Sequence, residues 1–214
     1  MREKIIIDCD PGQDDAVALF LALASPDELE ILGITAVAGN VPLSLTQRNA
    51  RIVCDIAQNK DTIVYAGCPR PMLLELVTAE NVHGNTGLDG VDVYEPEQTL
   101  GDLHAVDFIV ETLKAANKNS ITLVPTGPLT NIAMAIIKDP TIIDNIKQIV
   151  LMGGAMREAG NLSASAEFNM RVDPHAAQVV FDCGKPITVM SLDVTHKVLT
   201  TKERVKRISE IGNP

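Results

Sequence analysis

Residues 8–15 read DCDPGQDD and place four carboxylates directly after an apolar run. Capping of a following helix explains Asp14 or Asp15, since an aspartate there stabilises a helix by about 1 kcal/mol, but it does not explain all four. Asp10, Asp14 and Asp15 can converge across the Pro-Gly turn, and converging carboxylates repel unless a proton or a cation joins them. Oxygen-only ligand sets favour Ca²⁺ or Mg²⁺ over zinc or copper. The spacing therefore predicts a site for a hard cation.

The elements that must position these carboxylates alternate along the chain. Short runs rich in Ile, Val and Leu predict strands at 4–8, 30–38, 62–66, 120–124, 148–152 and 187–191. Helical periodicity predicts helices at 14–24, 43–58, 104–117, 131–138, 174–182 and 200–211. This order indicates one α/β domain over residues 1–214, a doubly wound, mostly parallel sheet flanked by helices. Such sheets bind ligands beyond the carboxyl ends of their strands, where the acidic turn lies. Two longer irregular stretches, 67–101 and 153–172, are further functional candidates.

Composition excludes several classes of partner. The formal net charge of −10, with no tryptophan and 3% aromatic residues, argues against binding of nucleic acid polymers. The longest apolar run, residues 16–24, is well short of the roughly 20 residues that span a membrane, so no membrane segment is expected. Four widely spaced cysteines without a CxxC pair predict reduced thiols. The chain lacks the apolar segment of a secretory signal near its start, and a cytoplasmic location is expected.

Two familiar acidic motifs can be tested by spacing. A calcium-binding EF-hand that starts at Asp8 requires Asp or Asn where this chain has Gly12, and Glu where it has Leu19, so that motif is excluded. A strand that ends in Asp-x-Asp is also similar to the haloacid-dehalogenase-like phosphatases, in which the first aspartate is a nucleophile beside Mg²⁺. Here Pro11-Gly12 replaces the continuation typical of that family. A magnesium-dependent phosphatase is kept as the alternative.

Residues 8–16, DCDPGQDDA, carry a stronger resemblance. Five further blocks follow in order along the chain: VAGN at 37–40, NVHGNTGLDG at 81–90, PTGPLTN at 125–131, MGG at 152–154 and AEFN at 166–169. In these blocks the chain resembles the inosine–uridine-preferring nucleoside hydrolases. The resemblance implies hydrolysis of the N-glycosidic bond of purine or pyrimidine ribonucleosides, such as uridine, cytidine or inosine, to ribose and free base. A nucleoside- or ribose-binding module without turnover is a second alternative.

The resemblance also implies roles for single residues. Asp10, Asp15 and the backbone carbonyl of Thr126 would bind Ca²⁺, and Asp10 would take a proton from a Ca²⁺-bound water that attacks the sugar. His83, in the glycine-rich stretch, would be a second catalytic residue, near the leaving base. The expected sugar-binding residues carry amides, carboxylates or a thioether, and each alone is equally typical of a loop or a core: Asp14, Asn40, Met152, Asn161, Glu167 and Asn169.

Finally, the resemblance implies a homo-oligomer, a tetramer or dimer, that serves purine and pyrimidine salvage. Family members continue well beyond the point that matches Pro214, and their C-terminal part supplies another metal-binding aspartate. Nothing after Asp193 offers such a residue. We therefore expect the 214 residues to be a C-terminally incomplete hydrolase domain, with weak Ca²⁺ binding and little turnover if the native polypeptide ends there.

Overall fold

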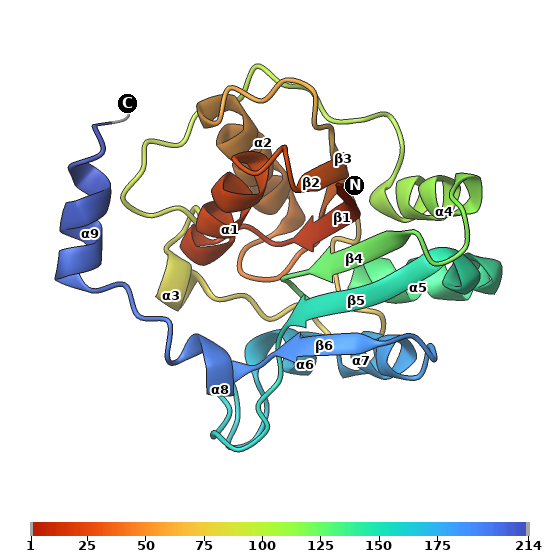
Figure 1. The fold of residues 1–214 in the computed structure, drawn as a ribbon. Coiled ribbons are helices and arrows are strands. Elements are labelled where there is room, and N and C mark those ends of the chain that lie inside the picture. Colours follow the sequence, from red (N-terminus) through yellow and green to blue (C-terminus); the bar gives the residue numbers. More distant parts are fainter. Residues whose placement is uncertain (1, 213–214) are drawn as a thin grey trace.

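The computed structural model describes residues 2–212, and its centre is a sheet of six parallel strands in the order β3-β2-β1-β4-β5-β6 (Figure 1). The strands are β1 (Glu3–Cys9), β2 (Leu29–Ala36), β3 (Val64–Ala66), β4 (Ile121–Pro125), β5 (Ile146–Met152) and β6 (Ile187–Met190). Every one overlaps a predicted strand. The predicted doubly wound, parallel α/β sheet is confirmed.

The predicted helices are also present. They are α1 (Gln13–Leu23), α2 (Leu43–Ile56), α4 (Ala105–Ala115), α5 (Thr130–Lys138), α7 (Pro174–Phe181) and α9 (Lys202–Ser209). The sequence reading missed four short elements: α3 (Glu80–His83), the 3₁₀ helix η1 (Pro140–Asn145), α6 (Phe168–Val172) and α8 (Leu192–Thr195). Two of them, α3 and α6, lie inside stretches that were predicted to be irregular, and each is too short for a periodic signal.

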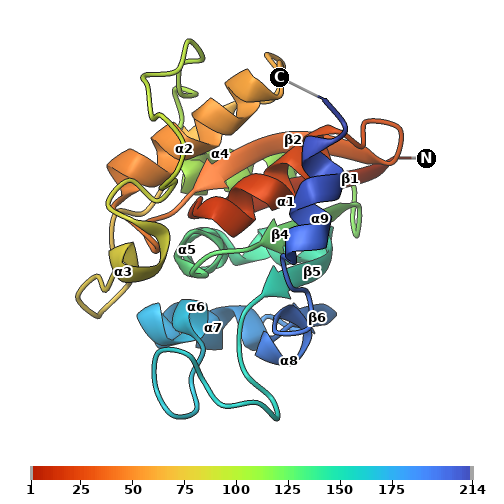
Figure 2. The same cartoon turned by 90° about the vertical axis from the view of Figure 1, so that its left-hand side faces the viewer.

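The sheet carries a hydrophobic core on each face. Side chains alternate along β1, so Ile6 packs with Ile132 of α5 on one face, while Ile5 and Ile7 pack with Leu19 of α1 on the other. Helices α4, α5 and α7 lie together on the first face, and α1 and α2 lie on the second (Figures 1 and 2). Full burial of one such side chain stabilises the fold by about 1.5–3 kcal/mol.

Strand order reverses between β1 and β4, and this reversal positions the acidic turn. From β1 the chain moves outward to β2 and β3, then returns to add β4 on the opposite side of β1. The backbone N–H of Thr126, just after β4, donates to the carbonyl of Asp8 in β1 at 2.8 Å. The two strands therefore end side by side at a topological switch point, which is where doubly wound sheets bind ligands.

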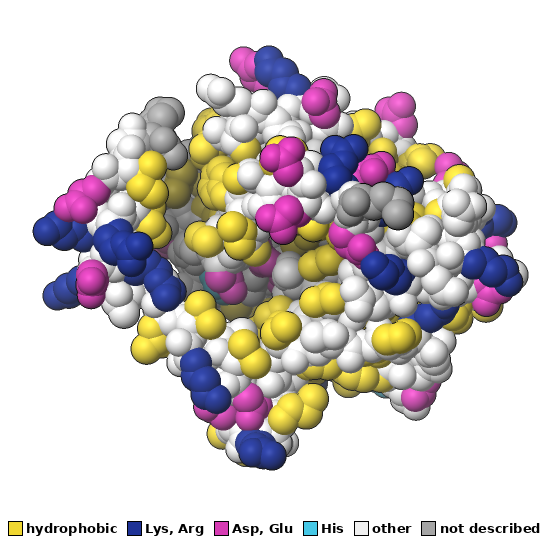
Figure 3. All heavy atoms as spheres, viewed as in Figure 1, with side chains coloured by type: hydrophobic (Ala, Val, Ile, Leu, Met, Phe, Trp, Pro, Cys, Tyr) yellow, Lys and Arg dark blue, Asp and Glu magenta, His cyan; other side chains and the backbone are white. Residues whose placement is uncertain are grey.

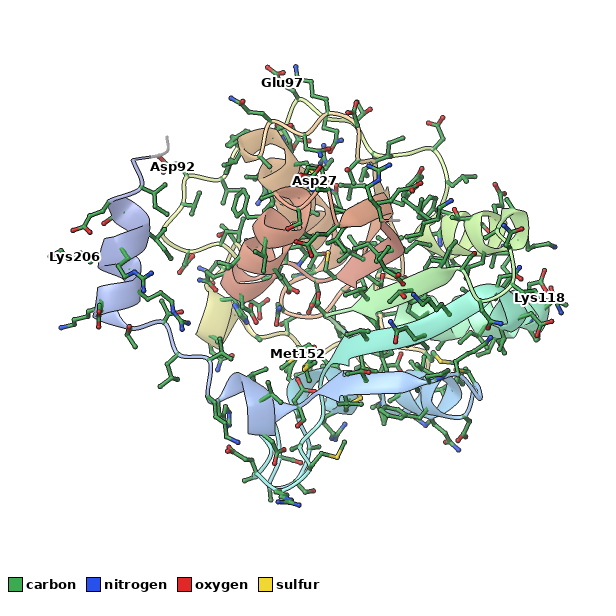
Figure 4. The ribbon with its side chains drawn as sticks, in the orientation of Figure 1. Asp27, Asp92, Glu97, Lys118, Met152 and Lys206 are labelled. Atoms are coloured by element: carbon green, nitrogen blue, oxygen red, sulfur yellow. The ribbon has the colours of Figure 1, made fainter. Side chains whose placement is uncertain are left out.

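Helix α9 stands apart from both cores. In Figure 1 it lies to one side of the sheet, in Figure 2 it stands in front of the fold, and Lys206 marks it at the periphery in Figure 4 (Figures 1, 2 and 4). Its apolar residues Val205 and Ile208 are 52% and 60% exposed. Within residues 2–212, no helix has the length and apolar character needed to cross a bilayer.

Candidate active site

A cavity of about 200 Å³ opens at the carboxyl end of the sheet. All of the predicted site residues except Asp10 line it: Asp14, Asp15, Asn40, His83, Thr126, Met152, Asn161, Glu167 and Asn169. Figure 3 shows acidic side chains inside a hollow on this face, and Figure 4 places Met152 at the carboxyl end of β5 near the centre of the molecule. Residues far apart in the sequence thus meet around one space.

Asp10 lies below this cavity and is 1% exposed. Its Oδ2 accepts a hydrogen bond from the backbone N–H of Asn40 at 2.7 Å, and its backbone carbonyl accepts one from the Asn40 side chain at 3.0 Å. Gly39 and Gly127 flank the carboxyl, and a Cβ at either position would lie 2.0 or 2.4 Å from a carboxylate oxygen. The two glycines therefore make room for Asp10. Its Oδ1 is buried and has no hydrogen-bond partner among the described residues.

Asp15 joins Asp10 from the first turn of α1. Its Oδ1 accepts a hydrogen bond from the Thr126 hydroxyl at 2.5 Å, and its carboxyl lies within hydrogen-bonding reach of Asp10. Burial, followed by repulsion from Asp14, raises the pKa of Asp15 to about 7. Burial, followed by repulsion from Asp15, raises the pKa of Asp10 well above its usual range. Two carboxylates in contact below the surface therefore require a shared proton or a cation.

The donors around this pair suit a hard cation. Asp10 offers its unpartnered Oδ1. In the part of the chain that the structure describes, the Thr126 carbonyl accepts one hydrogen bond, from the Asn169 amide at 2.8 Å, which leaves its second lone pair. All these donors are oxygens, as Ca²⁺ and Mg²⁺ prefer. Across residues 2–212, no group of three or more His, Cys, Asp or Glu side chains could hold a metal ion. A cation here would therefore rely on the two carboxylates and the Thr126 carbonyl.

The environment of Asp8 differs from that of Asp10 and Asp15. It is fully buried, and its Oδ1 accepts hydrogen bonds from Thr35 at 2.6 Å and Asn131 at 2.7 Å. Burial is the main cause that raises the pKa of Asp8 to about 7. Asp8 does not line the cavity. The phosphatase alternative requires this first aspartate to attack a substrate, whereas its hydrogen bonds to Thr35 and Asn131 hold the carboxyl inside the fold and argue against that role.

Glu167 and Asn169 organise a further part of the cavity wall. The Glu167 carboxylate is 2% exposed and accepts hydrogen bonds from the backbone N–H groups of Gly154, Asn169 and Met170 at 2.9, 2.9 and 3.2 Å. The bonds from Asn169 and Met170 cap α6, which explains why a helix begins inside a stretch predicted to be irregular. Asn169 donates to the backbone of Thr126 and Met152. The wall is thus fixed by backbone contacts.

Asn161 reaches the cavity from the loop after β5. Its Oδ1 accepts a hydrogen bond from the Phe168 N–H at 2.8 Å, which leaves its NH₂ group able to donate elsewhere. His83 lies on the other side, at the end of α3, half-buried. Sequence reasoning missed six further lining residues. Three of them directly neighbour a predicted site residue, namely Val82, Leu162 and Phe168, and three do not, namely Thr78, Ala79 and Asn81. Proximity to the motif residues was the signal that could have found them.

Comparisons with known proteins identify a family. Residues 5–214 match the family model described as inosine-uridine preferring nucleoside hydrolase. The chain is 46% identical over 214 residues to the inosine-uridine preferring nucleoside hydrolase of Leishmania major, covering 99% of this chain and 67% of the relative. It is also 46% identical to the pyrimidine-specific ribonucleoside hydrolase RihB of Escherichia coli O1:K1, covering 100% of this chain and 67% of that protein.

Solved structures show the same relationship. A purine-preferring ribonucleoside hydrolase from Gardnerella vaginalis superposes with a TM-score of 0.91 at 37% identity, covering 97% of this chain and 66% of that one. The chain thus spans about two thirds of the length of the relatives that it matches. On this sequence and structural similarity, the chain belongs to the inosine-uridine preferring nucleoside hydrolase family.

Proposed function

We propose that this protein hydrolyses the N-glycosidic bond of ribonucleosides and releases ribose and the free base. Family membership supports the reaction class. The observation that carries the proposal is the buried Asp10 carboxyl with an unpartnered oxygen. It lies within hydrogen-bonding reach of Asp15, which bonds to Thr126 at a cavity lined by amides and carboxylates. Such a lining suits a polyhydroxylated sugar, because amides and carboxylates supply the donors and acceptors that hydroxyl groups need.

We propose Ca²⁺ as the cofactor, held by Asp10, Asp15 and the Thr126 carbonyl. Support comes from the oxygen-only donor set and from the charge of two buried carboxylates. A bound divalent cation lowers the pKa of water and can orient hydroxyl groups of a sugar.

The chain's own residues then account for the remaining chemistry. Asp10 accepts a proton from water as the water oxygen forms a bond to the anomeric carbon of ribose. The bond from that carbon to the base nitrogen breaks, and its electron pair leaves with the base. Positive charge develops on the ribosyl group, and the carboxylates of Asp14 and Asp15 at the cavity stabilise it. Asn40, Asn161 and Asn169 would hold the sugar hydroxyls, with Met152 packed beside the ring.

The proposal also covers the oligomeric state and the cellular location of the protein. A homo-oligomer, tetramer or dimer, fits the exposed apolar residues Val17 and Leu21 of α1, which are 67% and 71% exposed. We further propose a cytoplasmic role in nucleoside salvage, by family resemblance. Light scattering of the native protein measures the mass of the assembly, and a monomer at micromolar concentration would contradict the oligomer.

The direct test is release of reducing sugar from inosine, uridine and cytidine by the native full-length protein in the presence of Ca²⁺. Hydrolysis by wild type that is lost in Asp10→Asn supports the proposal. Phosphate release from a phosphomonoester without any sugar release would indicate the phosphatase alternative. Nucleoside binding without turnover would indicate a binding module.

A further inference from the structure

Gln13, the variable position of the DPGxDD motif, contacts His83 twice. Its side-chain Nε2 donates to the His83 backbone carbonyl at 3.3 Å, and its Oε1 lies 2.6 Å from the His83 ring Nδ1. One amide group at the start of α1 therefore touches both the backbone and the ring of a residue at the end of α3. Nothing in the sequence pattern links these two positions, which are 70 residues apart.

The two contacts together determine which ring nitrogen carries a proton. A backbone carbonyl only accepts hydrogen bonds, so the NH₂ group of Gln13 must face the His83 carbonyl. The amide oxygen then faces Nδ1, and because that oxygen also only accepts, Nδ1 must be the donor. The neutral imidazole of His83 is thus held with a proton on Nδ1 and a lone pair on Nε2.

The His83 ring packs against Gly12. A Cβ at Gly12 would lie 2.4 Å from Nδ1 and 2.7 Å from Cε1 of His83, so the ring rests directly on the glycine backbone. The Nδ1 edge faces the start of α1, and Nε2 is not among the three atoms nearest to that position. Within residues 2–212, His83 is the histidine that lines the cavity. Nε2 is therefore the ring nitrogen left for a ligand.

We propose that Gln13 is a positioning residue for His83, holding the ring in the Nδ1–H tautomer so that Nε2 exchanges a proton or hydrogen bond with the ligand. The tautomer is a property of the free protein, whereas its use in catalysis rests on the proposed hydrolase function. In that use, a protonated His83 gives its Nε2 proton to the leaving base nitrogen, which takes the electron pair of the broken bond. The neutral Nδ1–H ring remains, already hydrogen-bonded to Gln13.

The first test is spectroscopic and needs no activity. Long-range ¹H–¹⁵N correlation spectra of protein labelled at histidine distinguish protonated from unprotonated ring nitrogens, and His83→Ala identifies the His83 signals. Wild type should show His83 as the Nδ1–H tautomer in the neutral ring. Gln13→Met, whose thioether is only a weak acceptor and cannot donate to the carbonyl, should lose that preference. A wild-type ring that is protonated on Nε2, or an unchanged tautomer in Gln13→Met, would overturn the proposal.

Gln47 provides a matched control. It lies on α2, donates to the Ser44 carbonyl at 2.9 Å and accepts from Arg51 at 3.1 Å, so it makes the same kinds of bond away from the cavity. Gln47→Met should leave the His83 spectrum and the nucleoside kinetics unchanged. An equal change in both variants would show that any surface glutamine has this effect and would overturn the positioning role.

The second test is a double-mutant cycle in nucleoside hydrolysis. Gln13→Met should lower kcat about tenfold or more with little change in KM, since a general acid contributes about 10²- to 10⁴-fold. In a His83→Ala background the same substitution should cost less than about twofold, because Gln13 acts through His83. An equal loss of kcat in both backgrounds would show that Gln13 does not act through His83. If wild type hydrolyses no nucleoside, the proposed function fails, while the spectra still decide the tautomer.

Discussion

The carboxylate of Asp193 accepts a hydrogen bond from the backbone N–H of Met156 at 2.8 Å, which ties α8 to the loop that carries Asn161 into the cavity. Its second oxygen accepts from the Arg157 N–H at 3.0 Å. The Met156 bond is the largest of the effects that lower the pKa of Asp193 to about 2. A group with a lowered folded pKa stabilises above its unfolded pKa and loses this contribution as pH falls toward 2. Asp193 therefore holds the loop throughout the neutral range.

Asp193→Ala should release this loop. We expect KM for a ribonucleoside to rise about tenfold, with a smaller change in kcat, since Asn161 loses its fixed position. Hydrogen exchange should become faster in residues 155–165. Asp139 is the matched control, because it accepts from Thr141, has a pKa lowered to about 2 and does not line the cavity. The same rise in KM in Asp139→Ala would contradict the role of Asp193.

Asn131 should contribute to the stability of the fold. It is fully buried, its amide donates to Asp8 at 2.7 Å, and its oxygen accepts from the Cys68 N–H at 2.8 Å. Asn131→Leu leaves both groups without that partner, so the free energy of unfolding should fall by about 2–4 kcal/mol. Asn145 donates one bond, to the Leu113 carbonyl, and Asn145→Leu should cost only about 1 kcal/mol. Urea denaturation measures the free energy of unfolding of both variants. An equal loss in the two would contradict the larger effect expected for Asn131→Leu.

The regular part of the fold was predictable because its signals are local. Each strand is an apolar run, and each longer helix has an amphipathic or apolar period, so order alone implied the parallel sheet. The short helices were missed because contacts outside their own residues stabilise them. For α6, Glu167 supplies the amino-terminal hydrogen bonds, and no period in Phe168–Val172 indicates a helix.

The site was predictable as a set of positions and less so as a set of contacts. The family motifs assigned Asp15, Thr126 and Asn169 to one site, and in the structure these three residues line the same cavity. The bonds from Gln13 to His83 and from Asp193 to the loop could not be read from the sequence, since they join segments that only the folded chain brings together. The roles of the site residues stay predictions until kinetics test them.

Calcium should bind at Asp10 and Asp15. Calorimetry should detect Ca²⁺ binding in wild type, and Asp10→Ala should weaken it by several kcal/mol, because ligand number and charge set affinity. Asp144→Ala, a surface carboxylate paired with Lys118, should bind as wild type does. Chelation should abolish nucleoside hydrolysis, and Ca²⁺ should restore it. Unchanged affinity in Asp10→Ala would exclude the assigned site.

The cavity should select ribose over deoxyribose. A site that binds a hydroxyl rejects the analogue without it, because the site's polar groups then lose their partner. The kcat/KM for 2′-deoxyuridine should therefore be at least about a hundredfold below that for uridine, since such sites can discriminate by up to 10⁴–10⁵. Equal values for the two substrates in an active preparation would contradict sugar recognition through the 2′-hydroxyl.

Release of ribose from inosine and uridine, measured side by side for wild type, Asp10→Asn and Asp144→Asn, tests the central claim most directly. Asp144 pairs with Lys118 on the surface and does not line the cavity, so its variant controls for the loss of one carboxylate. Wild type and Asp144→Asn should release ribose at the same rate, with one free base for each ribose. Asp10→Asn should release ribose about 10²- to 10⁴-fold more slowly. Equal rates in Asp10→Asn and wild type, or no ribose release by native full-length protein with Ca²⁺, would contradict the account.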